Sequence, residues 1–309
     1  MISIVIVNWN SGRLLQRCVH SLETNAPNCQ IIVVDNASND ASTHFPVKAD
    51  SDFTVLHNPY NLGFAAACNR GWKAARGEYI LFLNPDTECF SGSVECLQRT
   101  LTADDSVRAV GGCLVAPDGR PQTEFNVRPF PTISRVSAEV FFMDEIGRVC
   151  RRNRSSEGSH PGVATDVEQP AAACLMTSKT VLESIGGFDE DFYPAWFEDV
   201  DLCRRIHEGG GRIQYHPEAR FLHHGGYSLH NMSRQDFLGY FHKNQIRYFR
   251  KHRGRLAALY VQKLVILGLL LRIGISLVHP LVPHVSRAAS AGIFWKALCS
   301  IATCREAWL

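Results

Sequence analysis

Short apolar runs alternate with helical patterns through the first half of this 309-residue chain. Runs rich in Val, Ile and Phe predict buried parallel strands at residues 2–7, 31–34, 53–56 and 79–83. Helical spacing lies between them, at residues 14–22 and 64–75. This alternation predicts an α/β fold with a parallel sheet and right-handed crossovers. In such sheets ligands bind beyond the carboxyl ends of the strands.

Every one of the four predicted strands is followed by Asn or Asp. The residues at these ends are Asn8, Asp35 with Asn36, Asn58, and Asn84 with Asp86. A turn-forming role accounts for any one of them. All four together favour a polar binding crevice at this edge of the sheet.

A second acidic cluster lies more than a hundred residues beyond Asp86. Glu198, Asp199 and Asp201 open a polar helical segment and follow the aromatic pair Trp196 and Phe197. Hard divalent cations prefer oxygen ligands and are commonly held by one or two carboxylates plus phosphates. A further carboxylate can take a proton from an incoming hydroxyl. We therefore expect a site for a cation, a diphosphate and a general base, with Asp201 paired to Arg204 or Arg205 on its own helix.

Bulk composition excludes few functions but narrows the setting. The net charge of +2 gives no overall field that favours nucleic acid. The eleven cysteines show no C-x-x-C pair and no zinc spacing. Buried reduced thiols of a cytoplasmic protein are the expected interpretation, because the cytosol keeps thiols reduced.

The second half has a weaker pattern and then regular structure again. Residues 125–168 predict a mobile loop or a partly helical insertion, with basic residues at Arg148, Arg151, Arg152 and Arg154. Strands are expected at residues 108–115, 171–177 and 212–215. Helices are expected at residues 181–185, 199–208 and 235–252.

The C-terminal part is very apolar over residues 256–278, although Lys263 and Arg272 interrupt it. Uninterrupted stretches are shorter than the ~20 residues of a spanning helix. Six basic residues precede it: Lys243, Arg247, Arg250, Lys251, Arg253 and Arg255. A helix lying in the membrane interface is favoured. A helix packed on the domain or on a second subunit, and a spanning helix, are the alternatives.

An ordered set of motifs resembles the family-2 inverting glycosyltransferases, and most of all their rhamnosyltransferase-like branch. The motifs occupy residues 5–11, 33–38, 61–71, 81–86, 186–192, 198–205 and 223–228. They include Leu81-Phe-Leu-Asn-Pro-Asp86 and Glu198-Asp-Val-Asp-Leu-Cys-Arg-Arg205. The resemblance runs from about residue 2 to residue 253.

The resemblance implies a GT-A fold, with a Rossmann-like, mostly parallel sheet flanked by helices and a C-terminal helical, partly apolar extension. The glycosyltransferase domain would span residues 1–253, with a nucleotide-binding half at about 1–115 and an acceptor half at about 116–253. Residues 254–309 would form the extension. Donor-binding positions carry over to Val7, Asn8, Asp35, Asn36, Asn61, Gly63, Asn69 and Asn84.

The same resemblance implies roles for the acidic groups. The metal-binding D-x-D element falls on Asn84-Pro85-Asp86, so its first ligand is a neutral Asn. Asp86 and His223 would hold Mg²⁺ or Mn²⁺, with His224 the weaker choice for the histidine. Asp199 would be the general base beside Glu198, and Trp196 and Phe197 would meet the acceptor. For Trp196 the alternative is a place in the apolar core, because its side chain is a large aromatic group.

The function that follows is transfer of a sugar from a nucleoside diphosphate, with dTDP-rhamnose the first choice of donor. The acceptor would be a saccharide or a polyprenyl-linked saccharide of a cell-surface polysaccharide. The enzyme would work in the cytoplasm at the inner face of the cell membrane, with a homodimer as one possible assembly and no nucleic acid partner. The rivals are a catalytically inactive sugar-nucleotide-binding scaffold and a nucleotidyltransferase. A dehydrogenase is disfavoured because no G-x-G-x-x-G follows the first strand.

Overall fold

The computed structural model describes residues 1–141, 162–225, 232–279, 281 and 286–303. The predicted basic loop around Arg148 to Arg154 lies outside these residues. The chain groups into two compact units. Unit 1 is Met1–Phe130, Ser159–Pro194 and Glu198–Asn231, and unit 2 is Pro131–Gly158, Ala195–Phe197 and Met232–Leu309.

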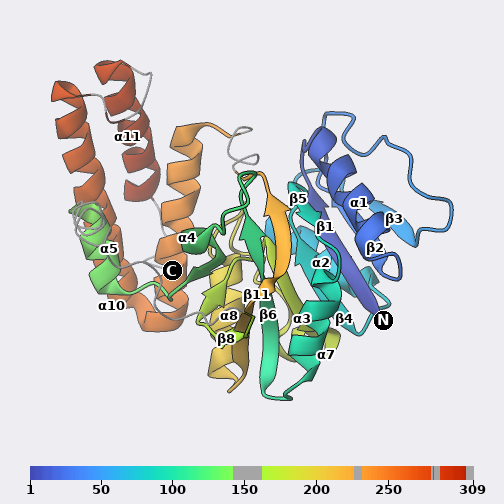
Figure 1. Ribbon diagram of the computed structural model, residues 1–309. Helices are drawn as coiled ribbons and strands as arrows, with labels where there is room; N and C mark the ends of the chain where they lie inside the picture. The colour runs from blue at the N-terminus through green and yellow to red at the C-terminus, as the bar shows by residue number, and fades with distance from the viewer. Residues whose placement is uncertain (142–161, 226–231, 280, 282–285, 304–309) are drawn as a thin grey trace. The chain divides into compact units, whose positions relative to one another are not determined.

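Unit 1 is built on one mixed sheet (Figure 1). Its strand order is β3-β2-β1-β4-β10-β6-β11-β5, and β8 pairs with β11 off this path. The strands are β1 (Ile2–Asn8), β2 (Gln30–Asp35), β3 (Phe53–His57), β4 (Tyr79–Leu83), β5 (Thr87–Cys89), β6 (Val107–Val115), β8 (Thr165–Asp166), β10 (Cys174–Ser178) and β11 (Arg212–His223). A second small sheet pairs β7 (Val127–Arg128) with β9 (Gln169–Pro170).

Parallel pairing, as predicted, holds among the first four strands and again between β6 and β11. The pairs β1–β2, β1–β4 and β2–β3 are parallel, as expected. β10 is then inserted antiparallel between β4 and β6, and β11 pairs antiparallel with β5. The α/β fold with helices flanking the sheet is as predicted, and the sheet combines parallel and antiparallel pairs. β3 is also half-exposed rather than buried, because it is the edge strand.

The helices of unit 1 are α1 (Arg13–Asn25), α2 (Phe64–Ala74), α3 (Ser93–Thr102), α4 (Thr123–Asn126), α7 (Lys179–Ile185) and α8 (Glu198–Glu208). They include the four that the sequence predicted, α1, α2, α7 and α8, and two that it did not, α3 and α4. Alternation along β1 divides the core between the two faces of the sheet. Ile4 and Ile6 join the cluster formed by the apolar residues of α1 and α3. Val5 faces α2, where a Cβ on Gly71 would lie 2.3 Å from its Cγ1, so only glycine allows this close approach.

Two strand boundaries differ from the sequence expectation. The strand expected at residues 171–177 begins only at Cys174, because Ala171–Ala173 lie outside it. The strand expected at residues 212–215 continues to His223 as β11, with irregular register between His216 and Arg220. The extra length brings His223 into register with Thr87 of β5, one residue after Asp86.

Unit 2 contains α5 (Ile133–Val140), α10 (Arg234–Val278) and α11 (Arg287–Ala302). The helices α10 and α11 pack side by side (Figure 1). α10 joins the two predicted helical segments, and Gly254 interrupts it with a φ of 81° and a ψ of 178°. The boundary predicted at residue 253 falls at this kink, whereas Met232 onward belongs to one compact unit. The domain division therefore stays a prediction.

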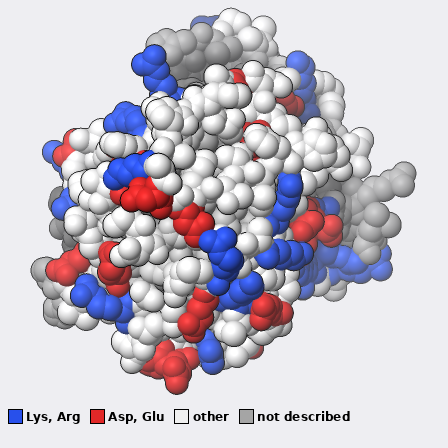
Figure 2. All heavy atoms as spheres, turned by 90° about the vertical axis from the view of Figure 1, so that its right-hand side faces the viewer, with Lys and Arg blue, Asp and Glu red and all other residues white. Residues whose placement is uncertain are grey.

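Charges and cysteines match the bulk expectations. Figure 2 shows basic and acidic side chains interspersed on the face it draws, in keeping with the small net charge. Nine cysteines lie among the described residues, all of them free, and Cys299 is the exposed one among them. Burial raises the pKa of the Cys29 thiol to about 11, so this thiol stays protonated and acts as an apolar core group.

Candidate active site

The register of β1 and β2 brings Asn8 beside Asp35. Asn8 Nδ2 donates to Asp35 Oδ1 at 2.8 Å and also to the hydroxyls of Ser38 and Ser42. Asn8 is fully buried, and its Oδ1 has no hydrogen-bond partner among the described residues. Its neighbour Val7 is also buried. An unpaired buried oxygen of this kind requires an explanation, and a ligand that donates to it is one.

Asn36 holds the turn that leads into α2. Its Nδ2 donates to Asn61 Oδ1 at 2.7 Å, and its Oδ1 accepts from Asn58 Nδ2 and from the Leu62 amide at 2.9 Å each. Gly63, with a φ of +86°, completes this turn. A Cβ there would approach Tyr193 Cδ2 at 2.9 Å and Pro194 O at 3.0 Å. The donor-binding roles of Asn36, Asn61 and Gly63 stay predictions, and the structure gives each of them a part in shaping the turn.

Asn69 is also committed to protein groups. Its Nδ2 donates to Phe188 O and to Glu190 Oε1 at 2.8 Å each. Its Oδ1 accepts from the Phe188 amide at 2.9 Å and from Trp72 Nε1 at 3.0 Å. The side chain is buried, so its hydrogen-bonding capacity is filled within the protein. Its predicted contact with the donor is not tested by this geometry.

The Asn84-Pro85-Asp86 element follows β4 and faces the end of β11. Asp86 is buried, and its Oδ1 lies 3.5 Å from His223 Nε2. His224 instead contacts Glu88 at 2.8 Å, which favours His223 over His224 as the partner of Asp86. Asn84 is half-buried, and its side chain makes no hydrogen bond to the described residues. The Asn84 side chain thus has no competing donor among the described residues, and the Asp86 carboxylate faces His223.

These groups fit a cation that shares its shell with a substrate. The carboxylate of Asp86 and the imidazole nitrogen of His223 face each other at 3.5 Å, which is longer than an ordinary N–H···O hydrogen bond. In the described part of the chain no three or more His, Cys, Asp or Glu side chains gather as metal ligands. Two protein ligands suit Mg²⁺ or Mn²⁺, since such ions commonly complete their shell with water and substrate phosphates.

The second acidic cluster forms the first turn of α8. Glu198 is buried and its Oε2 has no partner among the described residues. Burial, followed by the charge of Asp199, raises the pKa of Glu198 well above its usual range. Asp199 Oδ2 accepts from Arg128 Nη2 at 3.4 Å, and Arg128 Nε is itself buried and unpaired among the described residues. Two adjacent carboxyls thus differ in surroundings: burial favours the protonated form of Glu198, whereas Asp199 contacts the Arg128 guanidinium.

Asp201 is a structural residue of the same helix. Its fully buried carboxylate pairs with Arg205 at 2.8 Å, and Arg205 also donates to Ile185 O and Gly187 O. The prediction of an intrahelical salt bridge is confirmed. Arg204 pairs instead with Glu208.

Trp196 and Phe197 belong to unit 2. Both have a φ of +73°, an uncommon conformation for large side chains that marks a strained turn. Trp196 is half-buried and packs edge-to-face on Phe237, with ring centroids 4.8 Å apart. Phe197 is 6% exposed and packs on Phe241 and Tyr248. Acceptor contact stays a prediction for both, and burial leaves little of the Phe197 ring for it.

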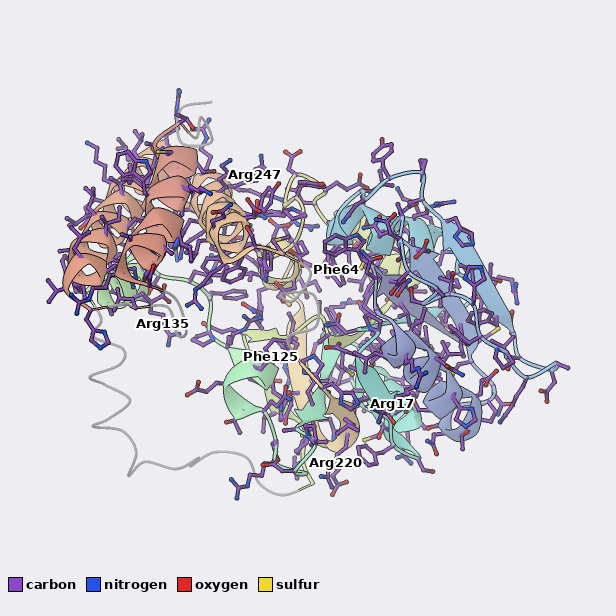
Figure 3. All side chains as sticks on the ribbon, turned by 90° about the horizontal axis from the view of Figure 1, so that it is seen from above. Arg17, Phe64, Phe125, Arg135, Arg220 and Arg247 are labelled. Atoms are coloured by element: carbon purple, nitrogen blue, oxygen red, sulfur yellow. The ribbon has the colours of Figure 1, made fainter. Side chains whose placement is uncertain are left out.

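Gln122 and Arg128 were missed by sequence reasoning. Gln122 contacts His223, and Arg128 contacts Asp199. Both lie at the edge of the segment where the apolar pattern weakens, and no motif marks them. The aromatic and basic residues between Phe125 and Phe130 were the available signal, since Phe125, labelled in Figure 3, lies in this segment and stacks on His223 by the distance between their rings.

Comparison with known proteins identifies the family of the chain. The family model of Glycosyl transferase family 2 matches residues 3–153. The chain belongs to glycosyltransferase family 2. The family-2 and rhamnosyltransferase-like resemblance of the motifs is thereby confirmed.

Two curated relatives extend the match beyond the first half of this family-2 chain. It is 26% identical over 245 residues to the N-acetylglucosaminyl-diphospho-decaprenol L-rhamnosyltransferase of Mycobacterium tuberculosis, covering 74% of this chain and 77% of the relative. It is 30% identical over 228 residues to the pre-mycofactocin glycosyltransferase of the same species, covering 72% of this chain and 42% of the relative.

Solved structures confirm the GT-A fold of this glycosyltransferase. A crystal structure of GalNAc-T7 with UDP, GalNAc and Mn²⁺ matches with a TM-score of 0.61 and 16% identity, covering 81% of this chain and 47% of that one. The mannosyltransferase PcManGT from Pyrobaculum calidifontis, in complex with GDP-Man and Mn²⁺, matches with a TM-score of 0.55 and 15% identity. That match covers 99% of this chain and 87% of the mannosyltransferase.

Proposed function

We propose that this chain is an inverting glycosyltransferase that moves a sugar from a nucleoside diphosphate to an acceptor hydroxyl. The observation that carries the proposal is where the unpaired buried polar atoms lie. Among the described residues three such side-chain atoms exist: Asn8 Oδ1, Arg128 Nε and Glu198 Oε2. Asn8 Oδ1 lies at the predicted donor site, and Glu198 Oε2 lies in the predicted base cluster. Arg128 Nε belongs to the residue that contacts Asp199. Native proteins rarely leave such atoms unpaired without a functional reason.

The reaction would be a single displacement. Asp199 would accept the proton of the acceptor hydroxyl as that oxygen attacks the anomeric carbon and the nucleoside diphosphate leaves. With Glu198 protonated, Asp199 would carry the negative charge in the first turn of α8. Asp35 and the buried Asn8 would bind the nucleoside. Asp86 and His223 would hold Mg²⁺ or Mn²⁺, which when bound neutralises the diphosphate. The Mn²⁺ present in two GT-A structures supports that ion here.

The donor and acceptor are proposed from the relatives. Similarity to a rhamnosyltransferase that acts on a decaprenol-linked diphosphosugar supports dTDP-rhamnose as donor. It also supports a polyprenyl-linked saccharide as acceptor, in the synthesis of a cell-surface polysaccharide. The carboxylates Asp86, Glu198 and Asp199 are all present, which argues against an inactive scaffold.

Membrane contact is proposed from one face of α10. Its exposed apolar residues are Leu256, Tyr260, Leu267, Leu270, Leu271, Ile275, Leu277 and Val278. By length and composition α10 is the one described helix apolar enough to cross a membrane, with 39% of its apolar window buried. We propose peripheral attachment at the inner face of the cell membrane, because basic residues precede the apolar face.

Vesicle flotation with anionic lipid tests this attachment. Wild type should float with the vesicles, and the paired variant Leu270→Glu/Leu271→Glu should not. The same variant run on a sizing column tests the homodimer. Loss of a dimer with unchanged flotation would assign the apolar face to a second copy and contradict membrane contact.

The base assignment is tested by Asp199→Asn. Loss of a general base slows transfer by roughly 10²–10⁴-fold, and we expect this loss with an unchanged melting temperature. Transfer from labelled dTDP-rhamnose, UDP-sugars and GDP-sugars to a membrane lipid fraction is the assay. Near-full activity of folded Asp199→Asn enzyme would refute the mechanism.

A further inference from the structure

Among the described residues the side chain of Gln122 contacts one partner, His223, through two atoms. Gln122 Nε2 donates to the backbone oxygen of His223 at 2.9 Å. Gln122 Oε1 lies 2.7 Å from His223 Nδ1. Because the carbonyl oxygen can only accept, it fixes the orientation of the amide and turns Oε1 toward the ring. An amide oxygen only accepts, so Nδ1 must carry the proton.

This contact determines what the other ring nitrogen presents to Asp86. In a neutral imidazole with Nδ1 protonated, Nε2 has a lone pair. That nitrogen lies 3.5 Å from Asp86 Oδ1, so two acceptors face each other in a buried place. A cation between or beside them satisfies both. A proton on Nε2 of His223 would instead point toward Asp86 Oδ1 and leave no lone pair on that nitrogen for a cation.

The rest of the segment fixes Gln122 itself. The backbone N–H of Gln122 donates to Leu114 O at the end of β6, at 2.9 Å. Buried Asn126 donates to the same oxygen and accepts from the Leu114 amide. Phe125 covers one face of the His223 ring, with centroids 5.0 Å apart and planes 19° apart. Figure 3 labels Phe125, which lies on α4, the helix that begins one residue after Gln122. The ring is thus held by a hydrogen bond in its plane and by a stack over its face.

We propose that Gln122 is a positioning residue that fixes the tautomer and the orientation of His223, so that Nε2 is presented with Asp86 to the divalent cation. The proposal rests on the cation site of the proposed function. Partners that hold the second nitrogen of a metal-binding histidine commonly contribute roughly 10- to 100-fold to metal affinity. Gln122 would therefore act on cation binding and not on the hydroxyl that attacks.

The test measures Mn²⁺ binding without an activity assay. Free Mn²⁺ is followed by electron paramagnetic resonance as protein is added, with Mn²⁺ alone and with dTDP, UDP or GDP. Gln122→Met keeps the volume and removes both hydrogen bonds, and we expect its Mn²⁺ dissociation constant to rise about 10- to 100-fold. Gln122→Glu keeps an oxygen that accepts from Nδ1, so we expect it to recover part of this loss. The matched control is Gln16→Met at an exposed position of α1, which should bind as wild type does.

The outcomes separate this proposal from the one beneath it. Equal Mn²⁺ binding by wild type and folded Gln122→Met would overturn the role of Gln122 and leave the cation site intact. Absence of Mn²⁺ binding by wild type with every nucleotide would overturn both. A loss in Gln122→Met that Gln122→Glu does not recover in any part would contradict the tautomer argument, because packing alone would then explain the effect. Thermal unfolding of each variant confirms that the protein tested is folded.

Discussion

Replacement of Asn69 separates a shaping role from a contact with the donor. Asn69 links α2 to the Gly187–Glu190 turn through three hydrogen bonds and accepts a fourth from Trp72 within α2. Asn69→Ala leaves the Phe188 amide, the Phe188 carbonyl and the Trp72 indole without this partner. Each buried polar group left unpaired costs about 1–3 kcal/mol, so three of them lower the free energy of unfolding by about 3–9 kcal/mol. In urea this shifts the unfolding midpoint by about 1 M or more, for a slope near 3 kcal/mol/M.

The assay compares urea unfolding with nucleotide affinity. Asn28→Ala, at an exposed position, is the matched control and should shift the midpoint little. If Asn69 shapes the turn, folded Asn69→Ala should bind nucleotide within a few-fold of wild type at low temperature. An unchanged unfolding midpoint together with lost nucleotide binding would refute this reasoning and assign Asn69 to the donor.

Two further substitutions in α8 follow from burial. Asp201→Ala removes the buried carboxylate that pairs with half-buried Arg205 and should cost about 3–5 kcal/mol, or roughly 6–20 °C in melting temperature. Glu208→Ala, from a more exposed pair, should cost under about 1 kcal/mol. Equal melting temperatures of the Asp201→Ala and Glu208→Ala variants would contradict the structural role of Asp201. Glu198 has a raised pKa, so the folded state keeps a proton that the unfolded state loses as the pH rises above about 4.5. Its contribution to stability is complete below that pH and falls above it. Glu198→Gln should remove this fall in urea unfolding measured from pH 4 to 8, and an unchanged pH profile would contradict it.

The repeating part of the fold was predictable because it depends on periodicity. The first four strands and the helices α1 and α2 lie within a few residues of their predicted positions. The antiparallel insertion of β10 was not predictable, since a short apolar run looks the same in either direction. The edge position of β3 was missed for the same reason, because edge position depends on pairing.

The candidate site was predictable where one motif carries a group and not where two distant segments meet. Asp86, Glu198 and Asp199 stand out as carboxylates at element ends. The partners Gln122 and Arg128 come from a segment without strong periodicity. Gln122 contacts His223 at the end of β11, which extends beyond its predicted length. Asn36 and Asn69 were expected to meet the donor, whereas the structure shows both making protein contacts that no spacing reveals.

The measurement that tests the central claim most directly is calorimetric binding of dTDP, UDP and GDP, each with Mn²⁺ and with a chelator. Wild type and Asp86→Asn are compared, and no knowledge of the acceptor is needed. The account predicts that one nucleotide binds wild type with Mn²⁺, and that chelation or Asp86→Asn weakens this binding at least tenfold. Folded wild type that binds none of the three nucleotides under either condition would contradict it.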